Sequence, residues 1–148
     1  MKALIQRVAH AQVEVEQKIV SKIERGYLVL LGVEKGDTQQ TADKMLAKLL
    51  KFRINEDENG KMNLNIVDAG GSLLIVSQFT LCADTSRGNR PSFNGASPDL
   101  ANELYTYFAD QAAKQVHVER GIFAADMKVS LLNDGPVTFM LEVAPEVN

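Results

Sequence analysis

Cysteine and histidine are scarce in this sequence: its 148 residues include one cysteine, Cys82, and two histidines, His10 and His117. A single cysteine excludes an internal disulfide, and this set does not supply the usual ligands of a zinc site. Neither histidine lies beside a nucleophile motif, and the Gly-x-Ser-x-Gly elbow is absent, so a serine triad is not expected. Both histidines are therefore interpreted as structural or exposed. Any hydrolysis by this chain therefore has to proceed without the usual base or metal.

Long hydrophobic runs and a basic surplus are also lacking. No apolar stretch reaches the roughly 18 to 20 residues of a membrane helix, and the first seven residues become polar too early for a secretory signal. We therefore expect a cytoplasmic protein without a membrane partner. The chain has 19 acidic and 16 basic side chains, whereas nucleic-acid binders usually carry excess positive charge. This charge balance counts against broad binding to a phosphate backbone, but it does not exclude binding to one end of a nucleic acid.

The remaining composition is that of one globular domain spanning residues 1–148, with 45% hydrophobic and 24% charged residues. Alternating or continuous apolar patterns predict strands at residues 4–8, 11–15, 19–23, 27–33, 72–77, 117–123, 127–132 and 137–143. We see no repeat, linker, Gly-rich phosphate loop or dinucleotide fingerprint, and we expect no cofactor.

Two segments have helical spacing instead. Asp37 is the expected cap of the first helix, with Gln40 at the capping-box position, and Ser97 with Pro98 begins the second. Their apolar stripes are Ala42, Met45, Leu46, Leu49 and Leu50 in the first helix, and Leu100, Leu104, Tyr107, Phe108 and Gln111 or Ala112 in the second. Lys44, Lys48 and Lys51 fall on the opposite face of the first helix and are interpreted as a solvated face. Many strands with two main helices predict an α+β fold with a mostly antiparallel, barrel-like sheet.

Proline interrupts the last two expected strands at Gly135-Pro136. Proline inside a paired strand loses a ladder hydrogen bond, so it belongs at an edge, a turn or a bulge. Asp134-Gly135 is also a turn signal, which favours a hairpin. From these residues alone, a hairpin turn and a specialised proline position both remain open.

A second unusual segment, Ser77-Gln78-Phe79-Thr80-Leu81, ends the most hydrophobic of the late strands. A strand that stops and turns exposes successive backbone N–H groups, which can polarise a carbonyl as an oxyanion hole. The hydroxyl of Thr80 and the amide of Gln78 would lie beside them. The alternative is that these are ordinary polar residues at a strand end, and Cys82 is interpreted as a small buried hydrophobe.

Six segments, in this order, resemble the bacterial D-aminoacyl-tRNA deacylase family. They are Ile5-Gln6-Arg7-Val8, Gly70-Gly71-Ser72, Ser77-Gln78-Phe79-Thr80-Leu81, Gly88-Asn89-Arg90-Pro91-Ser92-Phe93, Ala124-Ala125-Asp126-Met127 and Asn133-Asp134-Gly135-Pro136-Val137-Thr138. Each segment is weak alone, but the ordered set is specific and spans essentially the whole chain. The resemblance implies a homodimer that hydrolyses the ester between a D-amino acid, or glycine, and the 3′ end of tRNA.

The resemblance also implies roles for individual residues. Gly135 and Pro136 would form a Gly-cisPro element that enters the partner subunit's pocket and holds the substrate's α-amino group, so that an L side chain collides with backbone. Ser77, Gln78, Phe79 and Thr80 would form the catalytic segment. Arg7 would brace the Gly-Pro element and Met127 would contact substrate, while Arg87 and Arg90 would steer the acceptor end of tRNA.

Three alternatives remain open at this point. Thr80 is a nucleophile in one version of the mechanism, but the sequence offers it no base, so we favour a water attack assisted by the ribose 2′-hydroxyl. A noncatalytic module that binds tRNA ends or nucleotides would use Arg87, Arg90 and the lysine face. An editing hydrolase for L-amino acids would need a trans Gly135-Pro136 bond.

Overall fold

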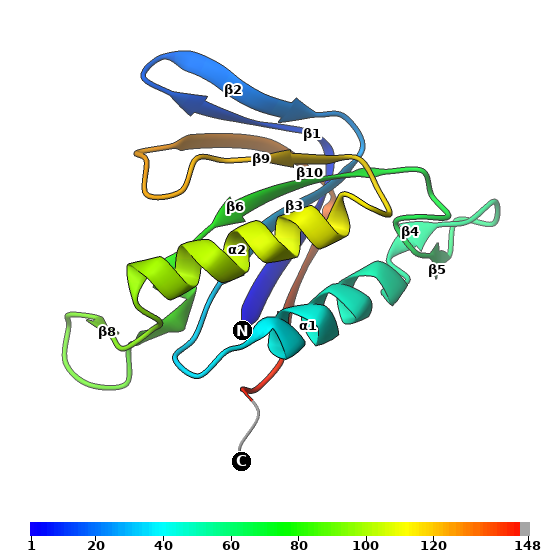
Figure 1. Ribbon diagram of the computed structural model, residues 1–148. Coiled ribbons are helices and arrows are strands. Elements are labelled where there is room, and N and C mark those ends of the chain that lie inside the picture. The colour runs from blue at the N-terminus through cyan, green and yellow to red at the C-terminus, as the bar shows by residue number, and fades with distance from the viewer. Residues whose placement is uncertain (146–148) are drawn as a thin grey trace.

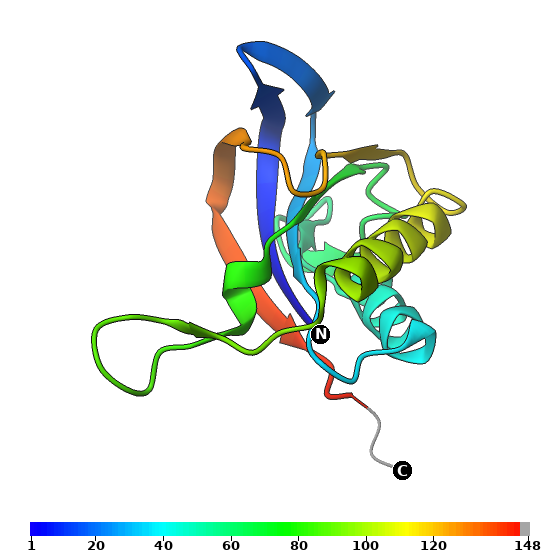
Figure 2. The same ribbon diagram turned by 60° about the vertical axis from the view of Figure 1, so that its left-hand side comes forward.

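The computed structural model of the chain describes residues 1–145. A mixed sheet carries two helices side by side on one face (Figures 1 and 2). The elements are β1 (Lys2–Val15), β2 (Lys18–Ile23), β3 (Gly26–Gly32), α1 (Gln39–Lys51), β4 (Asn55–Glu56), β5 (Met62–Leu64), β6 (Ser72–Ser77), the 3₁₀ helix η1 (Phe79–Cys82), β7 (Ala83–Asp84), β8 (Ser92–Phe93), α2 (Pro98–Ala112), β9 (Val118–Arg120) and β10 (Lys128–Glu142). Neither helix has the length and hydropathy needed to cross a membrane.

The main sheet has the strand order β10-β1-β3-β6-β9, with β2 paired to β1. Strand β1 is antiparallel to β2, β3 and β10, whereas β3, β6 and β9 run parallel to one another. The parallel pairs follow from the two helices, because parallel neighbours need a crossover and α1 and α2 provide the two crossovers. The expected α+β fold with two helices and a barrel-like sheet is confirmed.

Strands β3 and β6 are buried on both faces because their alternating side chains enter two hydrophobic cores. The core under the helices takes Tyr27, Val29, Leu31, Leu73 and Ile75, and the core on the other side takes Leu28, Leu74 and Val76. The second core also contains Val8 and Val13 of β1 and Ile23 of β2. The sheet therefore curls over its own second face, which gives it the barrel-like form. Residues 4–8 and 11–15, expected as separate strands, are one strand with register shifts around Val8.

The first helix begins one residue later than the sequence predicts. Thr38 is its cap and forms a capping box with Thr41: the Thr41 N–H donates to Thr38 Oγ1 over 3.4 Å, and the Thr38 N–H donates to Thr41 Oγ1 over 3.0 Å. Asp37 is buried instead, where its carboxylate accepts from the Met1 amino group at 3.1 Å and from the Glu34 N–H at 2.7 Å. Asp37 is therefore unable to cap the helix because its oxygens are engaged with the start of the chain.

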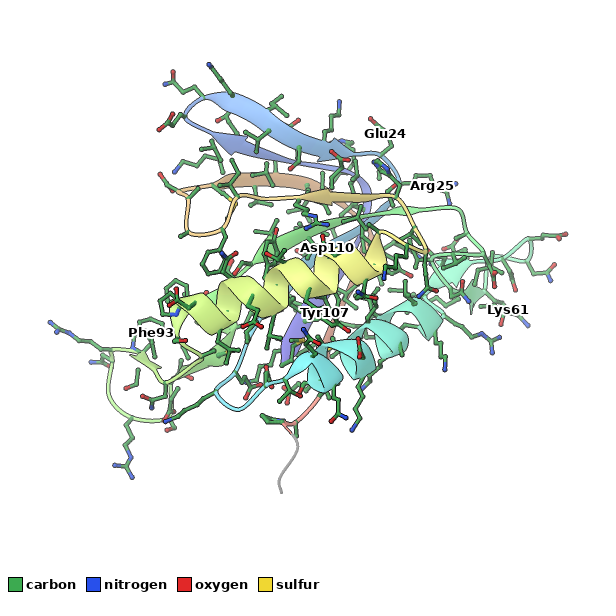
Figure 3. The ribbon with its side chains drawn as sticks, viewed as in Figure 1. Glu24, Arg25, Lys61, Phe93, Tyr107 and Asp110 are labelled. Atoms are coloured by element: carbon green, nitrogen blue, oxygen red, sulfur yellow. The ribbon has the colours of Figure 1, made fainter. Side chains whose placement is uncertain are left out.

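The second helix begins as expected, with Ser97 accepting from the Leu100 N–H at 3.3 Å and Pro98 in its first turn. Its buried stripe includes Leu104, Phe108 and Ala112 as expected, but Leu100 and Tyr107 are only half-buried. The Tyr107 hydroxyl donates to Asp43 on α1 at 2.7 Å, and Figure 3 shows this side chain between the two helices. The tyrosine therefore joins the helices at their solvent edge. Lys44, Lys48 and Lys51 are exposed, as interpreted from the sequence.

Candidate active site

A cavity of about 570 Å³ lies at the end of β6. Three of the predicted site residues, Ser77, Gln78 and Phe79, line one wall, and Met127 lines another. The rest of the lining comes from β6, the residue after β3, the segment around β8, the start of α2, and the loop before β10 with the start of that strand, at residues 33, 76, 93, 95–96, 98, 101, 123–126 and 129. Most of these side chains are apolar, so polar backbone groups at the strand end open into a largely apolar space.

The predicted catalytic segment, residues 77–80, is shaped by the transition from β6 to η1. Ser77 still pairs with Leu31 of β3, and the Gln78 N–H donates to the Leu31 carbonyl at 2.8 Å. The chain then turns, and the Leu81 N–H donates back to the Gln78 carbonyl at 3.3 Å. The N–H groups of Phe79 and Thr80 come first in this 3₁₀ turn, so the turn itself provides them no acceptor. Two adjacent backbone donors thus remain available where the sequence predicts an oxyanion hole.

Thr80 is placed differently from its three neighbours. It is exposed and does not belong to the residues that line the cavity. Its hydroxyl oxygen accepts from the side-chain amide of Gln78 over 2.5 Å. Thr80 therefore orients Gln78 at the cavity wall.

Met127 reaches the cavity because Gly121 leaves room for it. A Cβ atom at Gly121 would lie 2.7 Å from the Met127 sulfur. The Gly121 N–H donates to the Ile75 carbonyl at 3.1 Å, which fixes this backbone against β6. The position of Met127 therefore depends on the absence of a side chain at Gly121.

Two aromatic rings at the cavity are unusually exposed. Phe79 and Phe93 both line it, with exposed fractions of 64% and 53%, and their rings meet edge to face with centroids 5.3 Å apart. Figure 3 shows Phe93 near the start of α2. Phe93 belongs to a segment that carried the family resemblance, but its sequence gave no signal that it would pair with Phe79.

The Gly135-Pro136 pair lies inside one continuous strand, so the hairpin interpretation is wrong. The register of β10 against β1 moves from Thr138 opposite Gln6 to Asn133 opposite Val8, leaving residues 134–137 as a bulge. Asn133 closes this bulge: its Oδ1 accepts from the Val137 N–H at 2.7 Å, and its Nδ2 donates to the Thr138 hydroxyl at 3.0 Å. The Gly135-Pro136 bond is cis, as the family resemblance implies, and both residues are exposed.

Arg7 anchors this bulge from the neighbouring strand. It is 8% exposed, and its Nε donates to the Asp134 carbonyl at 3.0 Å while its Nη1 donates to the Ile54 carbonyl at 2.7 Å. Its Nη2 lies 3.3 Å from the position of a Cβ at Gly135. The guanidinium therefore contacts the backbone immediately before the Gly-Pro pair.

The predicted site residues thus divide into two groups on one chain. The lining of the large cavity includes Ser77, Gln78, Phe79 and Met127, but not Arg7, Gly135 or Pro136. We call the first group, together with the adjoining backbone N–H of Thr80, the cavity half, and the second group the Gly-Pro half.

Arg87 and Arg90 belong to neither half. Both are exposed in the loop between β7 and β8. Figure 2 shows this loop extending away from the body of the protein. Their place in the structure is therefore compatible with contact to a large partner and separate from the cavity.

Cys82 and the histidines lie outside any catalytic arrangement. Burial raises the pKa of the Cys82 thiol, helped by the charge of Glu34, so the thiol stays protonated near neutral pH. His10 and His117 are exposed, and His117 Nε2 lies 3.0 Å from a carboxylate oxygen of Glu119. Within residues 1–145, no cluster of three or more histidine, cysteine or acidic side chains is arranged to hold a metal ion.

Comparisons with known proteins agree with the motif pattern. The sequence model of the D-Tyr-tRNA(Tyr) deacylase family matches residues 4–142. Curated D-aminoacyl-tRNA deacylases from Haemophilus ducreyi and from Actinobacillus pleuropneumoniae serotype 5b are 64% and 62% identical to this chain over 144 residues, which is 97% of this chain and 100% of each relative.

Solved structures show the same fold. The c-Myc DNA Unwinding Element Binding Protein superposes with a TM-score of 0.93 at 40% identity, covering 97% of this chain and 99% of that one. A probable eukaryotic D-amino acid tRNA deacylase superposes with a TM-score of 0.81 at 16% identity, covering 96% and 98%. The full-length match to the family model and the high identity to its curated members show that this chain belongs to the D-Tyr-tRNA(Tyr) deacylase family.

Proposed function

We propose that this chain hydrolyses the ester bond of D-aminoacyl-tRNA and of mischarged glycyl-tRNA, and rejects L-aminoacyl-tRNA, in an active site shared by two subunits. One observation carries the proposal: Gly135 and Pro136 are exposed, yet they do not line the cavity of their own chain, whose lining includes Ser77, Gln78, Phe79 and Met127. Family membership supplies the general activity, because the chain is an enzyme of the D-aminoacyl-tRNA deacylase kind.

The cavity half suits the ester and the terminal adenosine. Its volume of about 570 Å³ lies within the range of small-molecule sites, and its apolar walls with a few polar groups are typical of such sites. Met127, Phe79 and Phe93 offer apolar and aromatic surface to a base, and stacking on aromatic rings is a common mode of contact with an unpaired base. The N–H groups of Phe79 and Thr80 would stabilise the oxygen that becomes negative when the ester carbonyl is attacked.

The Gly-Pro half suits the amino acid. By its family resemblance, the carbonyl oxygens of Gly135 and Pro136 accept from the substrate's α-amino group. An L side chain would then point into the backbone of this pair, whereas a D side chain would point away and glycine has none. Selectivity by exclusion accounts for broad use of D-amino acids together with removal of glycine.

The two halves would meet in a homodimer. Strand β10 is last in the sheet order, so one of its edges has no strand partner within residues 1–145. It also exposes Leu132, Phe139 and Met140 by 55%, 37% and 43%. Long apolar edge strands are usually covered, since they otherwise promote aggregation. We infer that a second subunit covers this edge and inserts its Gly135-Pro136 pair into the cavity.

The chemical step we propose is a direct attack by water on the ester carbonyl. The water oxygen bonds to the carbonyl carbon, the bond to the ribose oxygen breaks, and the proton passes to that leaving oxygen with help from the neighbouring 2′-hydroxyl. Thr80 has no base and lies outside the cavity lining, so it positions Gln78 instead of attacking. Arg87 and Arg90 would contact phosphates of the acceptor end, and the cytoplasm is the expected location.

The first experiment is a parallel assay on D-Tyr-tRNA, L-Tyr-tRNA and Gly-tRNA with a metal chelator present. Release of D-Tyr and glycine without release of L-Tyr would support the proposal. Salt-sensitive binding of tRNA without turnover of any substrate would favour a noncatalytic module instead. Preferential release of L-Tyr would favour an editing enzyme for L-amino acids.

Subunit sharing is tested by mixing two inactive variants. Phe79→Pro removes a backbone donor from the cavity half, and Gly135→Ala changes the Gly-Pro half. A mixed dimer has one site in which both halves are native, so co-refolding should restore about a quarter of the wild-type activity. Activity that stays at the level of the separate variants would overturn the shared site.

A further inference from the structure

We propose that Asn55, which is hydrogen-bonded to Tyr27, is a positioning residue for substrate selectivity. It fixes the Ile54 carbonyl, which accepts a hydrogen bond from Arg7, and thereby fixes the position of Gly135-Pro136. This inference rests on the proposed function. It concerns a chain of contacts that runs from Tyr27 in the hydrophobic core through Asn55 and the neighbouring Ile54 carbonyl to Arg7 in the Gly-Pro half.

The chain begins where the first core ends. Arg7 lies directly opposite Tyr27 in the antiparallel pair of β1 and β3, so the two side chains share one face of the sheet. The same face of β1 carries Ala3 and Ile5 in the core, and Arg7 follows them at the next position. A charged side chain thus occupies the core face at the end of the sheet, where it needs hydrogen-bond partners.

Asn55 supplies the link between the core and those partners. It is 6% exposed, and its Nδ2 donates to the Tyr27 hydroxyl at 2.6 Å and to the Leu64 carbonyl at 3.1 Å. Tyr27 is fully buried, and its burial raises the pKa of the phenol to about 12, so the hydroxyl stays neutral. The side chain of Asn55 therefore ties the start of β4 to the rigid core and to β5.

The Ile54 carbonyl belongs to the peptide unit that leads into Asn55. Arg7 donates to this carbonyl at 2.7 Å and to the Asp134 carbonyl at 3.0 Å. A guanidinium is planar, so two directional bonds at its two ends fix its orientation. The carboxylates of Glu56 and Asp134 lie 3.9 and 4.0 Å from Arg7, but both are about 60% exposed and add little.

Packing does not secure Arg7 independently. A second cavity, of about 110 Å³, borders Arg7, Asn55, Glu56 and Asp134. Because open space lies beside the guanidinium, its position depends on the hydrogen bonds to the two carbonyls. A shift of the Ile54–Asn55 backbone would therefore move Arg7, and with it the Asp134 carbonyl and the Gly-Pro pair.

The effect should appear in selectivity. The exclusion of L-amino acids depends on a backbone element held to within a fraction of an ångström, and misplacement on that scale has large kinetic consequences. We expect Asn55→Ala to lower the ratio of kcat/KM for D-Tyr-tRNA over L-Tyr-tRNA by about tenfold. Tyr27→Phe removes the hydroxyl that accepts from Asn55, and it should also lower the ratio, by a smaller factor.

The experiment measures this ratio for the wild type, Asn55→Ala, Tyr27→Phe, Arg7→Gln and the double variant of Arg7→Gln with Asn55→Ala. Phe108→Leu, a change in the helix-side core that touches none of these hydrogen bonds, controls for general destabilisation. Because Asn55 acts through Arg7, the double variant should match Arg7→Gln alone. Phe108→Leu should keep the wild-type ratio even where its melting temperature falls.

Each outcome has a defined meaning. A wild type that does not discriminate D from L overturns the proposed function and this inference with it. A selective wild type with unchanged ratios in Asn55→Ala and Tyr27→Phe overturns this inference alone, as do effects of Arg7→Gln and Asn55→Ala that multiply in the double variant. If Asn55→Ala does not fold, Tyr27→Phe decides the question, because it keeps the shape of the core.

Discussion

The two halves of the proposed site, the cavity half and the Gly-Pro half, both rely on backbone groups, but they hold those groups in place by different means. In the cavity half, the end of β6 and the start of η1 direct the N–H groups of Phe79 and Thr80, so regular secondary structure fixes them. In the Gly-Pro half, a bulge leaves the sheet pairing, and the side chains of Arg7 and Asn133 hold it. The first half should therefore tolerate side-chain changes that keep the backbone, whereas the second should not.

Phe79→Pro tests the first half most directly. Proline suits the first position of a helical turn, and Gln78 already has an extended φ of −142°, so the backbone path is preserved while one N–H is lost. We expect kcat to fall by roughly 100- to 1000-fold, the usual effect of losing one oxyanion donor. Phe79→Leu keeps the N–H and is the matched control. Equal loss in both variants would assign the effect to the ring instead of the amide.

Gly135→Ala tests the second half. The residue has φ of +144°, and an added Cβ would lie 2.5 Å from a Val137 methyl and 3.3 Å from Arg7 Nη2. The bulge would have to move, so we expect kcat/KM for D-Tyr-tRNA to fall by about 100-fold. Circular dichroism should show a folded protein. Wild-type rates and selectivity would refute the placement of Gly135 in the site.

Gly121→Ala tests whether the cavity half tolerates an additional methyl group beside Met127. The new methyl group would press on the Met127 sulfur, whose flexible side chain can move into the cavity. We expect KM for D-Tyr-tRNA to rise by about tenfold with a smaller change in kcat. Steady-state measurement of both KM and kcat distinguishes weaker substrate binding from a loss of catalysis. An unchanged KM would show that Met127 does not contact the substrate.

Thr80→Ala removes the acceptor that orients Gln78. Loss of one neutral hydrogen bond corresponds to a rate effect of about two- to tenfold, so D-Tyr-tRNA hydrolysis should remain measurable. Complete loss of turnover with intact tRNA binding would mean that the hydroxyl is the nucleophile. Thr80→Ser, which keeps the hydroxyl, is the control.

Cys82→Ala should have the smallest effect, with activity within about twofold of wild type, because a half-buried, protonated thiol acts as a small hydrophobe. The raised pKa of this thiol has a second consequence. In the unfolded chain the thiol ionises near its ordinary value of 9.0, and in the folded chain it ionises later. The stability of the wild type relative to Cys82→Ala should therefore decline above that pH, as measured by urea unfolding. Rapid alkylation by iodoacetamide at pH 7 would contradict this account.

Most of the fold was predictable because its signals are local. Apolar alternation located the strands, and Ser97-Pro98 located the start of α2. The continuity of β10 was not predictable, because Asp134-Gly135-Pro136 has the local chemistry of a turn and only the pairing with β1 shows that the strand continues. The prediction that Asp37 caps the first helix was wrong for a similar reason, because its carboxylate binds the Met1 amino group, which is distant in sequence.

The same distinction applies to the site. The family motifs marked Gly135, Pro136, Arg7 and residues 77–80 as candidates, but nothing near Asn55 marks it as a partner of Tyr27, 28 positions earlier. The bulge-closing role of Asn133 and the pairing of Phe93 with Phe79 also depend on contacts that form only in the folded chain. Sequence patterns find residues that belong to a motif, whereas the residues that support a motif come from the rest of the fold.

The free edge of β10 has a consequence for how the enzyme is handled. If this edge is where two subunits meet, each active site exists only while the subunits are associated. Specific activity then becomes a function of enzyme concentration, constant when the protein is concentrated and falling on dilution below the dissociation constant of the dimer. A diluted assay would report a slow enzyme where the protein is in fact dissociated, so rates should be compared at several concentrations.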